Sequence, residues 1–329
     1  MPSPPPKPIP DYAALEVKKS AWTKPLRRWL QAVVFRGALA VIPLLPFRFT
    51  QALGKGTGRL FFRFSKKSKA TALAQLAMAF PDWSEDRRRQ TARDCFVHLG
   101  CTLWEILAMA RVQREARRWL VMENEEVLRA AQAEGRGVLA LVGHIGNWEM
   151  MSPMLGLLGM KGQAIMAPRS SEELTRIMVE SHQAPHLGII IRGSPQAPQQ
   201  MIRALKRGEI ILMAVDQDME ARGVFVEFFG RLAHTPRVAG SLALKHRLPV
   251  VASFDVRRPD GTHAVRFQRL EVPPDIPPGE EGVRQMTQLL TRATEEHIRQ
   301  HPAQWVWFHH RWKRRPEEPT GAGPVESAG

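Results

Sequence analysis

The stretch "GVLALVGHIGNWEM", residues 137–150, joins an apolar run to a histidine and then to a glutamate. The run VLALV contains no polar residue, which is typical of a strand buried on both faces of a parallel sheet. Gly143 and Gly146 flank His144 and permit a tight turn at the end of that strand. The sequence therefore predicts a strand, a turn that carries His144, and a helix that carries Glu149.

Further apolar runs and helical patterns alternate along the rest of the chain. The apolar runs are "GIII" (188–191), "IILMAV" (210–215) and "PVVASF" (249–254), and the helical patterns cover 172–184, 197–207 and 237–247. This alternation predicts an α/β catalytic domain over 136–315, with a mostly parallel central sheet flanked by helices. Active sites of such sheets gather beyond the carboxyl ends of the strands, which directs attention to His144 and to Asp216 and Asp218.

The N-terminal part of the chain predicts a helical region over 22–135 that associates with a membrane. Its apolar segment 29–47 follows basic residues and is interrupted by Pro43 and Pro46. We expect a membrane anchor there, either a marginal span or a helix lying in the interface, with a buried helix of a soluble protein as the alternative. The Pro-rich tail 1–21 and the tail 316–329 are expected to be disordered.

The net charge indicates which partners the chain favours, and the cysteine content indicates which structural sites it lacks. The chain has 47 Lys and Arg against 32 Asp and Glu, a formal net charge of +15, which favours anionic partners such as nucleic acid, anionic lipid, a phosphorylated substrate or an acidic carrier protein. Cys95 and Cys101 are the only cysteines, so neither a disulfide framework nor a four-ligand zinc site is indicated. We expect no metal and no cofactor.

The spacing of His144 and Glu149 constrains how the two can meet. Five positions on an ideal helix leave them roughly 140° apart, so His144 must lie in the turn and fold back over the first helical turn. Asn147 is placed to cap that helix, and we include it among the substrate-binding residues. A carboxylate that accepts from one imidazole nitrogen leaves the other nitrogen free as a base, and we expect Glu149 to do this.

The absence of a neighbouring serine or cysteine indicates that the nucleophile belongs to the substrate. Acyl transfer from a thioester to a substrate hydroxyl fits, because the hydroxyl needs a general base whereas a thiol, with a pKa of about 8.5, leaves readily. Backbone amides after Gly146 are expected to stabilise the oxyanion.

Several stretches also resemble a known family. "GHIGNWE" resembles the H-x-x-x-x-D/E signature of glycerolipid acyltransferases, and its surroundings are similar to the bacterial lipid A late acyltransferases, the lauroyl and myristoyl transferases. The resemblance runs from about Trp29 to Arg315. It is supported by "APRSSEEL", "IRALKRGEIILM", "MAVDQDMEARGVFVEFFGRLAHTP" and "PAQWVWFHHRWKRRP".

This resemblance implies a glycerolipid acyltransferase-like fold and a specific reaction. The donor would be an acyl-carrier-protein or coenzyme A thioester, and the acceptor a phosphorylated glycolipid, in the first place a lipid A precursor, at the cytoplasmic face of the bacterial inner membrane. Arg169 would contact a substrate phosphate. Met219 and Glu220 depart from the residues usual in close lipid A enzymes, which leaves a lysophospholipid, a phosphatidylinositol mannoside or an ornithine lipid as alternative acceptors.

Two other classes of function remain open from the residues themselves. Asp216 and Asp218 form a D-x-D, which in a metal-dependent glycosyltransferase holds a divalent cation; we favour a structural role or a role in orienting the acceptor, and include both among the substrate-binding residues. A non-catalytic membrane or nucleic-acid binding module would explain the charge but not the His–Glu pair. We interpret the Trp-rich, basic segment 305–315 as a strand and basic stretch at a lipid headgroup surface, with no nucleic-acid partner.

Overall fold

A mixed seven-stranded sheet forms the centre of the protein, as the computed structural model shows for residues 24–169, 171–182, 184–219 and 221–316. Both predicted tails lie outside these residues, apart from Pro316. The strand order is β1-β9-β8-β2-β5-β3-β4, and only the β8–β9 pair is antiparallel. The predicted α/β class with a mostly parallel sheet is therefore confirmed.

The strands and helices have the following bounds. The sheet contains β1 (Leu120–Glu123), β2 (Val138–Val142), β3 (Gly162–Met166), β4 (Leu187–Ile191), β5 (Ile210–Ala214), β8 (Val250–Arg257) and β9 (His263–Arg269), and a separate hairpin contains β6 (Gly223–Phe228) and β7 (Arg231–Pro236). The helices are α1 (Lys24–Val41), α2 (Phe47–Phe64), α3 (Lys66–Ala79), α4 (Glu85–Leu107), α5 (Met109–Arg114), α6 (Ala116–Trp119), α7 (Glu125–Ala133), α8 (Met151–Leu158), α9 (Glu172–His182), α10 (Ala197–Lys206), α11 (Val238–His246) and α12 (Gly279–Gln300), with short 3-10 turns η1 (Ile42–Leu44), η2 (Trp148–Met150) and η3 (Pro302–Gln304).

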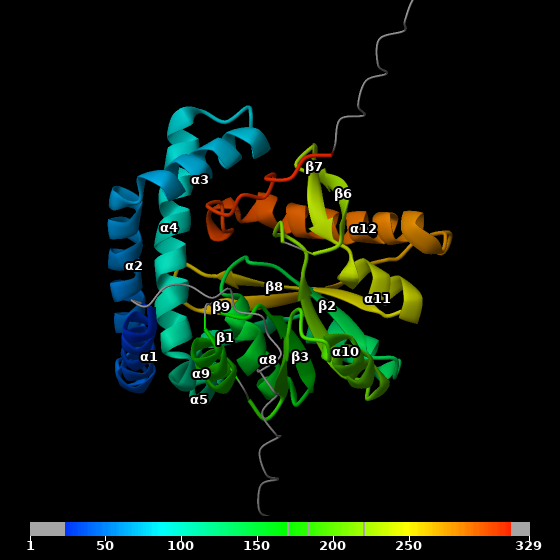
Figure 1. The fold of residues 1–329 in the computed structure, drawn as a ribbon, viewed down its shortest axis with the longest axis horizontal. Coiled ribbons are helices and arrows are strands. Elements are labelled where there is room, and N and C mark those ends of the chain that lie inside the picture. The colour runs from blue at the N-terminus through cyan, green and yellow to red at the C-terminus, as the bar shows by residue number, and fades with distance from the viewer. Residues whose placement is uncertain (1–23, 170, 183, 220, 317–329) are drawn as a thin grey trace, which may run out of the picture.

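Helices cover both faces of the sheet, as expected for strands without polar residues (Figure 1). Along β2, Leu139 and Leu141 point to one face and pack in the cluster that contains residues of α10, α11 and α12. Val138 and Ala140 point to the other face and pack with residues of α5, α7 and α8. The strand that precedes His144 is thus fixed from both sides, which gives the following turn a rigid base.

The N-terminal helices share this core with the sheet and do not form a separate region. Gly54 and Gly58 of α2 face Gly100 of α4, and a Cβ on Gly58 would lie 2.3 Å from the Phe96 carbonyl oxygen. These two glycines serve close helix packing. The strand β1 also comes from the region 22–135 that was predicted to be helical. It pairs with residues 263–266 of β9, a partner too distant in sequence for local patterns to reveal.

The apolar segment 29–47 is divided between two helices. Helix α1 ends at Val41, η1 contains Pro43, and Pro46 precedes the first residue of α2. Among the described residues, none of the helices combines the length and the apolar character that crossing a bilayer would require.

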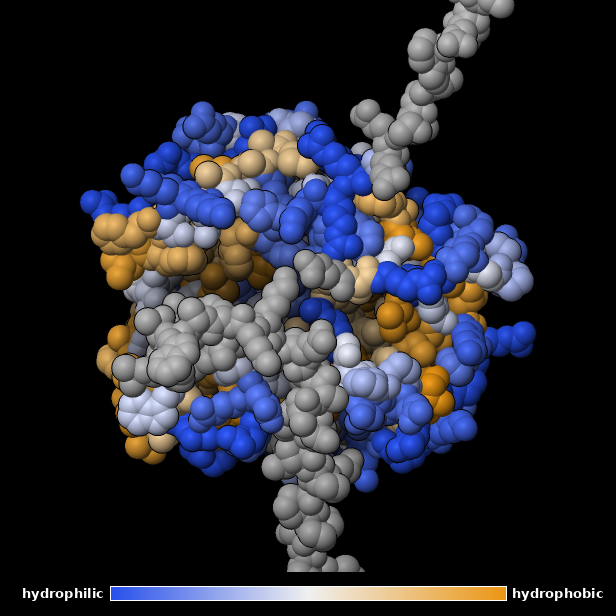
Figure 2. All heavy atoms as spheres, in the orientation of Figure 1, coloured by the Kyte–Doolittle hydropathy of each residue, from blue (hydrophilic) through white to orange (hydrophobic). Residues whose placement is uncertain are grey.

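Apolar side chains nevertheless gather on the outside of α1 and α2, at the left edge of the molecule in Figure 2. The exposed large apolar residues of this N-terminal surface are Trp29, Leu30, Val33, Val34, Val41, Leu44, Phe49, Leu60, Phe61 and Phe64. Such a continuous exposed patch marks an interaction surface.

The C-terminal aromatic segment differs from its predicted position. Trp305 and Trp307 are buried in the core, and Arg311 is also buried, where it donates to the His234 carbonyl and to the Thr235 hydroxyl. The segment forms turns after η3, with a single bridge between Trp305 and Ile145. The prediction of a strand at a lipid surface is therefore wrong, because these rings fill the core beside the His144 turn.

Candidate active site

The turn that carries His144 is held by contacts from three distant segments. Gly146 has a φ of 60°, and a Cβ there would lie 2.2 Å from the Asp255 carbonyl oxygen, so only glycine fits. The Gly146 amide donates to the Gln304 carbonyl at 3.0 Å, and the Asn147 amide donates to the Asp255 carboxylate at 2.7 Å. The predicted glycine turn at the end of β2 is confirmed.

Asp216 is the carboxylate that orients His144. His144 Nδ1 lies 2.9 Å from Asp216 Oδ1, and the His144 amide donates to Asp216 Oδ2 at 2.7 Å. Trp305 Nε1 donates to the same Oδ2 at 2.9 Å. Because the carboxylate accepts, Nδ1 carries the proton and Nε2 is left as a base. Burial opposes the charge of Asp216, but His144 and the donated hydrogen bonds outweigh it and lower its pKa to about 2.

The predicted pairing of His144 with Glu149 is corrected by this geometry. Glu149 lies in η2, directly after the turn, and its Oε2 is 2.8 Å from His182 Nε2 on α9. His182 Nδ1 donates to the Met178 carbonyl at 2.7 Å, so an acceptor lies near each ring nitrogen, which favours the protonated ring. Burial opposes both charges, yet the mutual attraction lowers the pKa of Glu149 and raises the pKa of His182.

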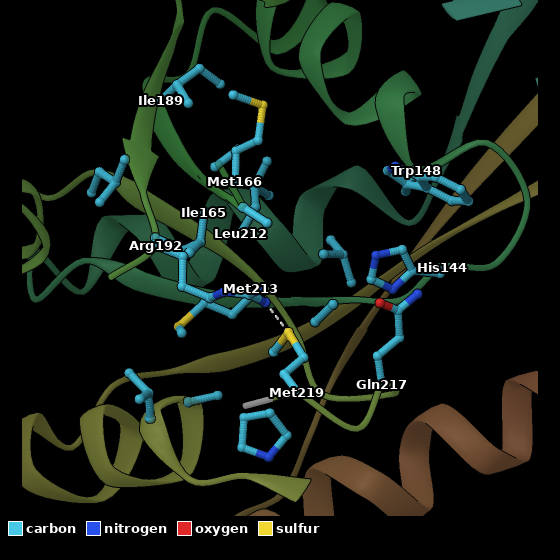
Figure 3. A pocket seen from close by; sticks show the side chains of 18 of the residues that line it. His144, Trp148, Ile165, Met166, Ile189, Arg192, Leu212, Met213, Gln217 and Met219 are labelled. Atoms are coloured by element: carbon cyan, nitrogen blue, oxygen red, sulfur yellow. Dashed lines mark hydrogen bonds between the residues drawn. The ribbon is translucent and has the colours of Figure 1, made fainter. Parts of the chain in front are cut away.

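Both pairs line one cavity of about 630 Å³ at the carboxyl ends of β2, β5, β3 and β4 (Figure 3). Its walls are mainly apolar, and its polar lining includes His144, Glu149, Arg169 and Gln217. The imidazole of His144 is 28% exposed and packs against the edge of Trp148, with ring centroids 5.0 Å apart. The base therefore opens into an apolar chamber of the size that holds an extended small ligand.

Asn147 does not lie among the lining residues. Its side chain is fully buried, accepts from the Glu149 amide at 3.2 Å and donates to Glu105 at 3.0 Å. The predicted helix cap is present, whereas the predicted contact with substrate is replaced by a structural role. The backbone amides of Gly146, Asn147 and Glu149 donate to protein groups, so these three amides do not form the oxyanion site that was expected after Gly146.

The D-x-D carboxylates are both occupied by protein donors. Asp218 Oδ1 lies 3.2 Å from His234 Nδ1 and 3.2 Å from Arg314 Nε, and its side chain is almost fully buried. Asp216 is engaged by His144 and Trp305. With each carboxylate already paired, the two do not form the open oxygen site that a glycosyltransferase metal needs.

Arg169 lines the cavity from the loop after β3, and its side chain is exposed, while its contact with a substrate phosphate stays a prediction. Glu149 lines the same cavity, and the charge of Arg169 contributes to lowering the pKa of Glu149.

The sequence patterns did not reveal several of the side chains that form the site. Trp305, His182 and Arg192 were not assigned to the site, whereas Gln217 belongs to the polar residues after an apolar run that the sequence singled out. The side chains of Arg192 and Gln217 point into the cavity in Figure 3. Arg192 directly follows an apolar strand, the position that already singled out His144.

A base with a buried orienting carboxylate, open to an apolar cavity, is an arrangement suited to general-base catalysis on a ligand held in that cavity. The family model described as bacterial lipid A biosynthesis acyltransferase matches residues 17–314, and the chain belongs to that family. The protein is accordingly an acyltransferase.

Curated relatives agree with this assignment at low identity. The chain is 28% identical over 284 residues to the lipid A biosynthesis lauroyltransferase of Escherichia coli, covering 85% of this chain and 90% of that protein. It is 25% identical over 287 residues to the lipid A biosynthesis palmitoleoyltransferase of the same organism, with the same two coverages of 85% and 90%. A lipid A biosynthesis acyltransferase of Haemophilus influenzae is 24% identical over 300 residues, covering 89% of this chain and 92% of that protein.

Asp216→Asn should remove most activity while leaving the fold in place. An amide cannot hold His144 in the Nδ1-protonated tautomer, so we expect kcat for acyl transfer to fall by about 10³- to 10⁴-fold. Initial-rate kinetics would measure this, with Asp260→Asn on the exposed β8–β9 turn as the control. Wild-type kcat in Asp216→Asn would show that Asp216 does not orient the base.

Glu149→Gln should lower the pKa of His182, because burial then acts on the imidazolium without its counter-ion. The raised pKa of His182 gives stability that is present below pH 6.5 and is lost as the pH rises through the pKa of His182 in the folded protein. The lowered pKa of Glu149 gives stability that is present above pH 4.5 and lost on acidification. The free energy of unfolding of the wild type should therefore exceed that of Glu149→Gln by the largest amount between pH 4.5 and pH 6.5.

Titration of the histidine NMR signals and thermal unfolding at several pH values would test this. Glu173→Gln, which removes a half-buried carboxylate paired with Arg36 from the same helix as His182, is the matched control and should leave the His182 titration unchanged. An unaltered His182 pKa in Glu149→Gln would contradict the ion pair.

Proposed function

We propose that this protein is a membrane-associated O-acyltransferase that moves a fatty acyl group from an acyl-carrier-protein or coenzyme A thioester to a hydroxyl of a phosphorylated glycolipid, a lipid A precursor. The observation that carries the proposal is the His144–Asp216 pair at the opening of an apolar cavity. Membership of the lipid A biosynthesis acyltransferase family supports the acceptor, and relatives named lauroyltransferase and palmitoleoyltransferase support a long acyl chain.

In the proposed reaction, His144 Nε2 removes the proton of the acceptor hydroxyl as its oxygen attacks the thioester carbonyl. Asp216 stabilises the imidazolium that forms. The tetrahedral intermediate then breaks its C–S bond, and the departing thiolate takes the proton from the imidazolium. The product is an ester and a free thiol, so the enzyme returns to its starting protonation. The side-chain amide of Gln217, which faces His144 in Figure 3, is able to donate to the oxyanion during this cycle.

Glu149 and Arg169 have supporting roles in the proposal. Arg169 and Glu149 both line the cavity, so the guanidinium and the carboxylate border the same ligand space. Arg169 is exposed, and no described residue forms a hydrogen bond or ion pair with its guanidinium, so it is free to bind an acceptor phosphate. Glu149 then acts on the substrate through Arg169 and not through His144.

The N-terminal surface of α1 and α2 is the proposed membrane contact. Its exposed apolar residues are accompanied by exposed Lys55, Arg59 and Arg63 on α2, the combination that favours an anionic bilayer surface. Helix α1 also contacts α9, through an ion pair between Arg36 and Glu173 at 3.5 Å. Since α9 supplies His182 to the cavity, a bilayer at this surface lies beside the site. We assign the protein to the cytoplasmic face of the bacterial inner membrane.

His144→Ala should lower acyl transfer from lauroyl acyl-carrier protein to a lipid A precursor by at least about 10²-fold, because the hydroxyl loses its base. The same variant should bind vesicles as the wild type does. Radiolabelled transfer assays would measure the loss, and His310→Ala, at an exposed position, is the control. Full turnover in His144→Ala would refute the mechanism.

Replacing Leu60 and Phe64 with glutamate should weaken binding to phosphatidylglycerol vesicles by about tenfold or more, because both apolar area and charge complementarity are lost. Co-sedimentation at several salt concentrations would measure the change. Leu232→Glu is a matched control, since Leu232 is also exposed but lies on the β6–β7 hairpin. An equal loss of vesicle binding in the Leu60 and Phe64 double variant and in Leu232→Glu would argue against α2 as the membrane contact.

A further inference from the structure

Arg192 places a cation on the wall of the cavity without a counter-ion among the described residues. It follows β4 directly, its amide donates to the Met166 carbonyl at 2.8 Å, and its side chain is half-buried. In the part of the chain that the structure describes, the sulfur of Met219 is the only hydrogen-bond partner of the guanidinium (Figure 3). A thioether is a weak acceptor, so the five N–H donors of this arginine are left largely unsatisfied.

Other buried arginines in this protein have strong partners. Arg257 pairs with Glu105 and donates to Thr102, and Arg311 donates to the His234 carbonyl and to Thr235. Arg192 differs because its neighbours on the cavity wall are apolar, among them Ile165, Met166, Ile189 and Leu212. Burial lowers the pKa of Arg192, which is the expected cost of a cation that no anion compensates.

The position of Arg192 separates it from the reacting centre. His144 follows β2 and Arg192 follows β4, and β5 and β3 lie between them in the sheet. Three strand spacings correspond to roughly 14 Å. This spacing separates the backbone positions, and Figure 3 shows Met213 and Met219 between the two side chains. A ligand group at Arg192 therefore belongs to a part of a substrate remote from the hydroxyl or carbonyl that reacts.

We propose that Arg192 is the anchor of a second anion subsite, which binds a phosphate ester of one substrate at the end of the cavity remote from His144. Arginine binds phosphate through two parallel hydrogen bonds, which would replace the weak contact with Met219. The subsite is distinct from Arg169, which follows β3 and is exposed. The phosphate has two possible sources, the phosphopantetheine arm of the donor and the phosphorylated acceptor.

The inference rests on the proposed acyl transfer, and steady-state kinetics of the full chain test it. Each substrate is used with and without its phosphate: acyl-phosphopantetheine against acyl-pantetheine, and the acceptor before and after phosphatase treatment. In Arg192→Met we expect KM for the phosphate-bearing form of one substrate to rise about 10- to 100-fold, with KM for the phosphate-free form unchanged. The substrate that shows this difference is the source of the phosphate.

Four further variants separate the subsite from other roles of the side chain. Arg192→Lys should recover part of the affinity. Met219→Glu keeps the cation but supplies an internal carboxylate, so it should raise the same KM, whereas Met219→Leu should not. Arg203→Met removes an exposed charge from α10, outside the cavity lining, and is the control.

Equal effects on phosphate-bearing and phosphate-free substrates would overturn the inference, as would a changed preference for acyl-chain length, which would make Arg192 a wall of the acyl chamber. Wild-type KM values in both Arg192→Met and Met219→Glu would also refute it, while leaving the proposed reaction intact. If the wild type transferred no acyl group, the proposed function itself would fail.

Discussion

The carboxylate of Asp216 is the point at which three parts of the chain are joined. One oxygen accepts from the imidazole of His144, and the other accepts from the His144 amide and from the indole of Trp305. The residue itself follows β5, so its hydrogen bonds connect the central strands to the C-terminal segment. A buried carboxylate with every donor in place is rigid, and this rigidity fixes both the position and the tautomer of the base.

A second group of buried polar side chains stabilises the turn that carries His144. Asp255 accepts from the Asn147 amide and from His263 Nδ1, and Glu105 accepts from the Asn147 side chain and pairs with Arg257. These side chains come from helix α4 and strands β8 and β9, so the three elements meet at the turn. Such a network is stable only when each member has its partners, which ties the geometry of the site to the packing of the N-terminal helices.

Local patterns predicted the parts of this protein that depend on neighbouring residues in the chain. The apolar run of β2, the glycine at 146 and the cap by Asn147 are all encoded within a few positions, and each was found as expected. The partner of His144 was missed, because Asp216 lies 72 residues away and the sequence offered a closer acid in Glu149. His182 was missed for the same reason: only the packing of α9 brings it to the carboxylate. The pairing of β1 with β9 likewise depends on tertiary contacts.

The burial of Trp305 has a consequence for the order in which the site is assembled during synthesis. A nascent chain emerges from the ribosome in order, so the strands of the sheet are made before the C-terminal segment. Until that segment is added, Asp216 lacks the indole donor, the Gly146 amide lacks the Gln304 carbonyl, and the bridge from Trp305 to Ile145 is missing. The turn that carries His144 therefore obtains all of these contacts only from a chain that extends past residue 305.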